Sequence, residues 1–301
     1  MDADVEPSPI PMKPEPAAAV GPDRRAAFKL ALGQMRVIPG DCGGNLARAR
    51  QFVARAAAQG AQVLLLPEML DVGWTHEGGD RDAGAIPDGA TCRELRAVAR
   101  EHRIHVCAGF GERCRDTIYN AAVLIDPRGD VILHHRKLNE LEIGHAACAQ
   151  GDRLGVVTTP LATFGLMICA DAFARGEIVS RTLGLMGADV ILSPCAWAVP
   201  ADHDPVREPY GRLWRDCYGP VARDFRLWIA GVSNVGPITS GPWRGRQCIG
   251  CSLVVGPDGQ PVTQGPYGAE AEALLIVEIT PVPRPARGDG WESVWRSAPA
   301  A

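Results

Sequence analysis

The sequence predicts an α/β fold in one domain, on three observations. Short apolar runs of strand length alternate with longer segments whose apolar residues recur at helical spacing. Turns rich in Gly, Pro and Asp bound the apolar runs. No linker divides the region from 28 to 279 into two halves. Many strands with a few helices and no domain boundary favour helices packed outside sheets.

The N-terminal half begins with a strand over 28–36. A helix should follow, with Asn45 as its N-cap and Gly60 as its stop. Thr91 with Glu94 three residues later predicts a capping box at the start of a second helix. The remaining elements of this half are strands at 63–66 and 104–107.

The C-terminal half contains a β-hairpin and further helices. Segments 119–125 and 131–135 flank a Pro- and Gly-containing turn and predict the hairpin. One helix is expected over 178–186, and another should start at Asp204 and be interrupted at 219–220 by Gly-Pro. The remaining strands are expected at 190–192, 227–232, 248–255 and 274–279.

Composition narrows the function classes. The chain has 301 residues, 46% hydrophobic and 22% charged, with a formal net charge of −4. This balance gives no footprint for nucleic acid or an anionic membrane. Ten irregularly spaced cysteines and no secretory signal favour reduced thiols and a cytoplasmic location. Residues 1–26 are expected to be a disordered leader, 27–280 the folded domain and 281–301 a C-terminal tail.

Three polar residues follow separate apolar runs and suggest a covalent-catalysis site. Glu68 follows the strand at 63–66, Lys137 follows the second hairpin strand, and Cys169 ends the apolar run 164–168 and precedes an expected helix. A thiol at a strand-to-helix turn lies beside free backbone N–H groups, which favour a thiolate and an oxyanion. The three residues supply a base, a cation and a nucleophile, so the chain is interpreted as an enzyme.

Four segments together resemble the nitrilase superfamily, also called carbon–nitrogen hydrolases. They are 65–68 (Leu-Leu-Pro-Glu), the hairpin ending in Arg136-Lys137, 165–171 (Gly-Leu-Met-Ile-Cys-Ala-Asp), and Gly-Cys-Ser at 250–252 before the turn 256–259. The segments occur in the family's order and at similar separations. The resemblance implies a four-layer α-β-β-α sandwich and a Glu-Lys-Cys site that needs no cofactor. It also implies pairing of subunits through helices into a homodimer, or a higher homo-oligomer built from that dimer.

The resemblance also implies a mechanism. Glu68 would take the thiol proton, Cys169 would attack an amide-type carbonyl, and ammonia would leave behind an acyl thioester. Lys137 and the backbone N–H of Ala170 are the candidates for the oxyanion hole.

The family usually has a second glutamate about two turns after the lysine. Counting without gaps places His145 there, and a small shift in the loop would bring Glu142, or next Glu140, into that position. This departure leaves the identity of the second glutamate open.

Substrate preference is inferred from the residues near the cysteine. Nitrile-cleaving relatives commonly have Trp-Glu after the cysteine, whereas this chain has Ala-Asp at 170–171, which favours a small carboxamide or an N-carbamoyl (ureido) compound. Trp74 and Trp197 are candidates for an apolar wall, and His145 is a further candidate for substrate contact. The candidate selectors of a charged substrate end are Arg175, Asp202 and Arg207.

Three alternatives stay open at this stage: nitrile hydrolysis, acyl transfer to an amine, and a catalytically silent dimeric binding or regulatory protein. Metal binding at Cys248 and Cys251 is not expected, because no second ligand pair is evident and strand alternation would separate the two thiols.

Overall fold

The computed structural model describes residues 26–284, in which two six-stranded sheets stack face to face. The first sheet has the order β15 (Ala273–Ile279), β1 (Phe28–Gln34), β2 (Val63–Leu65), β3 (His105–Cys114), β4 (Thr117–Ile125) and β5 (Val131–Arg136). The second has the order β14 (Pro261–Gln264), β13 (Leu253–Val255), β10 (Trp228–Ser233), β8 (Val190–Cys195), β7 (Thr163–Leu166) and β6 (Val156–Thr158). Contacts of β1 with β10, β3 with β8 and β4 with β7 join the two sheets.

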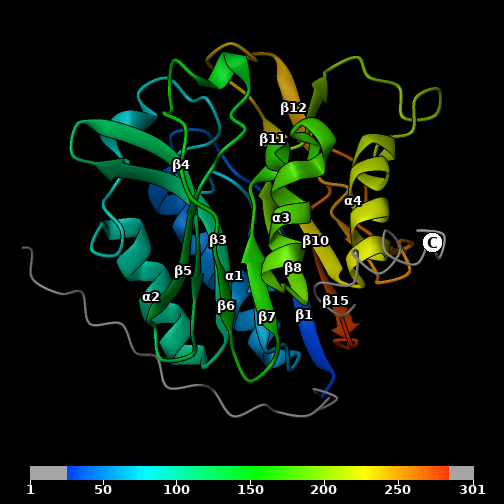
Figure 1. The fold of residues 1–301 in the computed structure, drawn as a ribbon. Helices are drawn as coiled ribbons and strands as arrows, with labels where there is room; N and C mark the ends of the chain where they lie inside the picture. Colours follow the sequence, from blue (N-terminus) through cyan, green and yellow to red (C-terminus); the bar gives the residue numbers. More distant parts are fainter. Residues whose placement is uncertain (1–25, 285–301) are drawn as a thin grey trace, which may run out of the picture.

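Helices cover both outer faces of the stacked sheets, so the layers are α-β-β-α as predicted (Figure 1). The helices α1 (Cys42–Ala58) and α2 (Ala90–His102) pack on the first sheet, and α3 (Ile178–Met186) and α4 (Arg212–Phe225) pack on the second. A small third sheet contains β11 (Val235–Pro237), β12 (Arg246–Ile249) and β9 (Ala198–Pro200). Short 3₁₀ helices are η1 (Gly79–Arg81), η2 (Glu142–Gly144), η3 (Cys169–Phe173) and η4 (Arg175–Glu177).

Alternating side chains explain why the first sheet reads as continuous apolar runs. Along β1, Leu30 and Leu32 belong to the core between the sheets, whereas Ala31 packs in the cluster beneath α1 and α2. Successive strand residues point to opposite faces, and here both faces are covered. Most positions at the centre of the sheet are therefore apolar.

Two predicted helix caps are wrong. Asp41 rather than Asn45 caps α1, accepting a hydrogen bond from the backbone N–H of Gly44. The buried Asn45 amide instead donates to the carbonyls of Ile38 and Asp71. The N-cap of α2 is Gly89, because the Thr91 hydroxyl donates to a buried carboxylate and Glu94 pairs with an arginine of α1.

The predicted start and interruption of α4 are also wrong. Asp204 accepts backbone N–H groups from a turn, and the helix begins at Arg212. Pro220 lies inside the helix, which continues to Phe225. A Cβ at Gly219 would approach the Gly259 carbonyl to 2.9 Å, so glycine allows this helix to lie against the turn at 256–259. Likewise, the single strand predicted over 248–255 is two strands, β12 and β13.

The two predicted terminal segments, the leader at 1–26 and the tail at 281–301, fall almost entirely outside the described residues. Within residues 26–284, no helix is both long and apolar enough to cross a membrane.

Candidate active site

The three strand-end residues meet at one cavity of about 190 Å³. Glu68 lies just beyond β2 and Lys137 just beyond β5, both in the first sheet. Cys169 lies beyond β7 of the second sheet and opens η3. The face-to-face stacking of the sheets therefore brings a carboxylate, an ammonium and a thiol from distant parts of the chain to the wall of the same cavity.

A buried network of charged hydrogen bonds surrounds Lys137. Its Nζ lies 2.7 Å from Oε1 of Glu68 and 3.2 Å from Oε1 of Glu140. Asn120 donates from Nδ2 to both carboxylates, at 2.6 Å to Glu68 and 3.2 Å to Glu140. The lysine and glutamate side chains are each 1% exposed. An ammonium between two carboxylates in so dry a setting is held in one orientation.

The structure places Glu140, and not Glu142, beside the lysine. Glu140 is three residues after Lys137, and its carboxylate turns back onto the ammonium. Glu142 is exposed in η2. His145 is also exposed, and its Nε2 lies 3.2 Å from the carbonyl of Glu140. The loop forms a tight turn after the lysine, so counting residues along the sequence did not identify the nearest carboxylate.

Sequence reasoning missed Asn120. It lies on β4, and its carbonyl accepts the backbone N–H of Lys137. A polar residue ahead of the apolar run 121–125 was the available signal. The contact of Asn120 with Lys137 depends on the pairing of β4 with β5, which places the two residues side by side.

Cys169 has a strained backbone. Its φ of +44° lies in the left-handed region, which is costly for a residue with a side chain. Its N–H donates to Oγ of Ser193 at 3.2 Å, and this hydroxyl also lies 3.4 Å from Sγ of Cys195. The expected helix after the cysteine is only the five-residue η3. The sharp turn aims the thiol at the cavity, as nucleophiles at functional sites often require.

Asp171 joins the cysteine turn to the lysine loop. Its Oδ1 accepts the N–H groups of Leu138 at 3.0 Å and Asn139 at 2.7 Å. Its Oδ2 accepts the N–H of Ile168 and lies 2.8 Å from Nε2 of the buried His135. One fully buried carboxylate therefore fixes the spacing between the segment that carries the cation and the segment that carries the thiol.

The environment shifts the pKa of each reactive group. Burial raises the pKa of Glu68 above its ordinary value, against the opposing effect of Lys137. Burial alone would lower the pKa of Lys137, but Glu68 and Glu140 outweigh it and raise that pKa. A hydrogen bond with Cys195, together with burial, raises the pKa of Cys169 well above its ordinary value. Both shifts favour the protonated forms, the thiol at Cys169 and the ammonium at Lys137.

Of the candidate substrate-contact residues, two lie at the cavity that contains the thiol. Trp74 and Trp197 line the cavity, and Ala170 lines it beside the thiol. The candidate selectors Arg175, Asp202 and Arg207 are exposed and absent from the lining.

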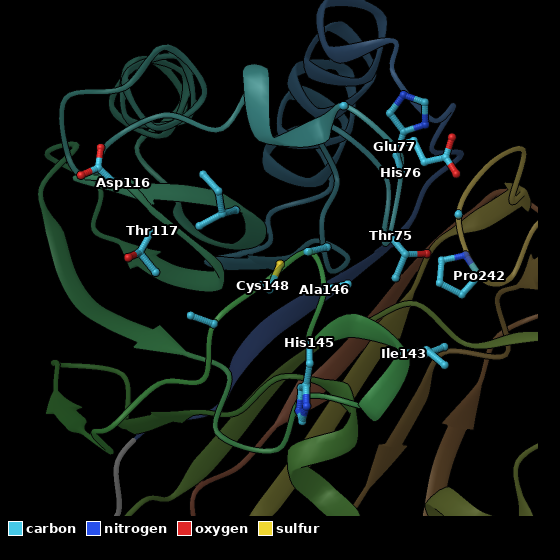
Figure 2. Close-up of a pocket in the computed structure, with 15 residues that line it drawn as sticks. Thr75, His76, Glu77, Asp116, Thr117, Ile143, His145, Ala146, Cys148 and Pro242 are labelled. Atoms are coloured by element: carbon cyan, nitrogen blue, oxygen red, sulfur yellow. The ribbon is translucent and has the colours of Figure 1, made fainter.

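His145 lines a second, wider cleft of about 880 Å³ (Figure 2), and not the cavity that contains the thiol. The residues that follow it, Ala146, Ala147 and Cys148, line the same cleft.

Metal ligands do not cluster in the described part of the chain. No group of three or more His, Cys, Asp or Glu side chains within residues 26–284 is arranged to hold a metal ion. Cys248 lies in β12, and Cys251 lies beyond the end of that strand with a positive φ.

Known proteins resemble this chain along most of its length. The family model for carbon–nitrogen hydrolases matches residues 29–284. A nitrilase of Pyrococcus abyssi is 33% identical over 240 residues, which cover 78% of this chain and 84% of the relative. An omega-amidase of Bos taurus is 31% identical over 184 residues, covering 57% and 64%.

Solved structures agree with the sequence relatives. An amidase of the nitrilase superfamily from Nesterenkonia superimposes with a TM-score of 0.72 at 25% identity, covering 86% of this chain and 92% of that one. The fold, the order of the segments and the family match lead to one conclusion. This chain belongs to the carbon–nitrogen hydrolase family, the nitrilase superfamily.

Proposed function

We propose that this protein hydrolyses the C–N bond of a small carboxamide through an acyl thioester on Cys169. One observation carries the proposal: the thiol lines the same small cavity as the buried Glu68–Lys137 pair, whose atoms are 2.7 Å apart. A thiol, a carboxylate and an ammonium gathered on one wall are the groups that acyl transfer to sulfur requires.

Acylation begins with proton transfer. Glu68 takes the proton of the Cys169 thiol as sulfur bonds to the carbonyl carbon, and the carbonyl oxygen becomes an oxyanion. Lys137 and the N–H of Ala170, both at the cavity wall, are the proposed donors to that oxygen. The C–N bond then breaks as Glu68 returns the proton to nitrogen, and ammonia leaves. The raised pKa of Glu68 suits a group that must both accept and donate a proton.

Deacylation uses the same carboxylate. Glu68 takes a proton from a water molecule as the water oxygen attacks the thioester carbonyl. The C–S bond then breaks, Glu68 passes the proton to the sulfur of Cys169, and the carboxylic acid leaves. Glu140 and Asn120 keep Lys137 aligned during both steps through the contacts described above. We therefore assign the second glutamate's role to Glu140, as a positioning residue.

The solved relatives support a nucleophilic cysteine. Structures of the Nesterenkonia amidase show the acetamide moiety of fluoroacetamide added covalently at that enzyme's active-site cysteine. The nitrilase of Pyrococcus abyssi makes nitrile hydrolysis the second candidate, since the same thiol would add to a nitrile carbon.

The test compares the native protein with Cys169→Ala and with Cys92→Ala, a matched control in which a buried thiol of α2 is removed far from the cavity. Ammonia release is measured with amides, nitriles and ureido acids, and intact mass is measured for an acyl adduct. We expect both signals with the native protein and the control, and neither with Cys169→Ala. Release from nitriles alone would establish the second candidate. Normal turnover by Cys169→Ala would refute the thioester, and a native protein without adduct or turnover would indicate a silent binding member of the fold.

We also infer that a second copy of the chain covers α3. Ile178 and Leu185 are 59% and 67% exposed on this helix, and Met186 is 37% exposed beside them. Exposed apolar side chains grouped on one helix mark an association surface, in agreement with the helix pairing that the family resemblance implies. Sedimentation should give a dimer, and Leu185→Arg should shift it to monomer.

A further inference from the structure

The wall of the cavity that contains the Cys169 thiol is largely aromatic. Six aromatic side chains line it: Trp74, Phe173, Trp197, Tyr210, Trp214 and Trp243. They support one another, since the Trp197 and Trp214 rings stack with centroids 4.5 Å apart and the Trp74 and Trp243 rings meet edge to face at 4.8 Å. The Trp214 indole N–H donates to the Tyr210 hydroxyl at 3.1 Å. Because these rings hold one another in place, the wall is formed before substrate arrives.

The described lining of the cavity offers no free cation for a substrate carboxylate. Among the described residues that line it, only Glu68 and Lys137 carry a full charge. Both are already engaged with each other, and Lys137 also with Glu140. A substrate carboxylate placed against the aromatic wall would lose water without gaining a cation, which is costly.

The cavity is also small. An apolar cavity of about 150 Å³ holds one benzene molecule, and this cavity is about 190 Å³. A single ring or a chain of a few carbons therefore fills it beside the carboxamide.

The geometry points to a substrate class: primary amides whose acyl group is uncharged, apolar and no larger than one aromatic ring. This inference rests on the proposed function, because it describes the acyl group that Cys169 would receive. Monoamides of dicarboxylic acids and N-carbamoyl amino acids are disfavoured, since each brings a free carboxylate into the aromatic cavity. The aromatic wall therefore favours neutral carboxamides over N-carbamoyl amino acids, two substrate classes that the sequence analysis did not distinguish.

Leu213 allows this preference to be tested without disturbing the core. It lines the cavity from the first turn of α4 and is 52% exposed, so a longer polar side chain can be accommodated there. Leu213→Arg would place a cation at the cavity's rim. Val262→Arg is the matched control, because Val262 is 51% exposed on β14 and is not part of the lining.

Ammonia release is measured for butanamide and benzamide against succinamate and N-carbamoylglycine. The native protein should show kcat/KM higher by 10- to 100-fold, as an order of magnitude, for the neutral amides. Leu213→Arg should lower the ratio of kcat/KM for neutral amides to kcat/KM for charged substrates by about 10-fold, and Val262→Arg should leave this ratio unchanged. Equal rates on the charged substrates, or the same ratio in both arginine variants, would overturn the substrate class while leaving the proposed hydrolysis intact.

A binding measurement separates failure of the substrate class from failure of the proposed function. Cys169→Ala retains the aromatic wall, so calorimetry on this variant compares the binding of neutral amides with that of succinamate in the absence of turnover. Binding of neutral amides over succinamate, with no ammonia from the native protein, would support the wall's selectivity and refute the hydrolysis. Equal or tighter binding of succinamate would overturn the substrate class whatever the native protein does.

Discussion

Asp171→Asn tests whether one carboxylate holds the lysine loop against the cysteine turn. The native side chain has four hydrogen-bond partners: three backbone N–H groups and Nε2 of His135. An asparagine has only one accepting oxygen. If that oxygen takes the place of Oδ1, Leu138 and Asn139 keep their acceptor, but the N–H of Ile168 faces an NH₂ group.

The magnitude follows from those contacts. The smallest loss is one buried N–H left without an acceptor, together with the charge that strengthened the remaining bonds. A hydrogen bond to a charged group contributes about 1.5–3 kcal/mol, and an orphaned buried donor costs about 1–3 kcal/mol. We expect the free energy of unfolding to fall by about 3–5 kcal/mol. Activity should fall by about 10²-fold, because a shift of about 1 Å between the cation and the thiol has that effect.

The assays are urea unfolding and ammonia release, with Asp126→Asn as the control. The Asp126 carboxylate also accepts two backbone N–H groups, from Arg128 and Asp130, but in the hairpin turn away from the cavity. The control should lose stability and keep kcat once folded. If Asp171→Asn retained native kcat, or lost no more of it than Asp126→Asn, the role assigned to this carboxylate would be refuted.

Three further predictions concern ionisable groups. Glu140→Gln should lower kcat by about 10- to 100-fold, because Lys137 loses a charged partner that positions it. Glu142→Gln should leave kcat/KM within about twofold, because Glu142 is exposed. Steady-state kinetics that rank the two variants in the opposite order would contradict the positioning role assigned to Glu140. The pH profile of kcat/KM should fall on the acid side with a midpoint above the ordinary glutamate pKa of 4.5, since burial raises the pKa of Glu68 and its protonated form accepts no proton; a midpoint at or below 4.5 would count against Glu68 as base. The pKa of Glu112 is about 2, because hydrogen bonds from Arg136 and His134 outweigh the burial that would raise it. A lowered folded-state pKa stabilises the protein above about pH 4.5, and that stability is lost as the pH falls towards 2. Glu112→Gln should therefore lower the free energy of unfolding by about 1–3 kcal/mol at pH 7 and by much less near pH 2, and a pH-independent difference in urea unfolding would rule this out.

The residue patterns by themselves predicted an α/β fold with helices outside sheets and picked out three polar residues at strand ends, whereas the four-layer arrangement was implied by the family resemblance. A strand buried on both faces is apolar at most positions, so the apolar runs before Glu68 and Cys169 indicate buried strands. A polar residue at the end of such a run is conspicuous for the same reason. Local patterns of this kind need no knowledge of distant parts of the chain.

The helix starts were less predictable, because capping side chains have competing partners. Asn45 and Thr91 are both residue types that favour an N-cap position. In the fold, however, the Asn45 amide donates to the Asp71 carbonyl and the Thr91 hydroxyl donates to the Asp71 carboxylate. Tertiary contacts thus outweighed the local preference.

Only the tertiary structure decided which groups surround the reactive residues. Asn120 reaches the lysine through strand pairing, and Glu140 reaches it through a tight turn. The aromatic wall draws Trp74, Trp214 and Trp243 from segments separated by up to 169 positions (243 − 74). Spacing along the chain carries no information on such encounters, since the stacking of two sheets sets which loops share one end of the sandwich. The sequence identified the candidate reactive side chains, and the tertiary structure determined which side chains surround them.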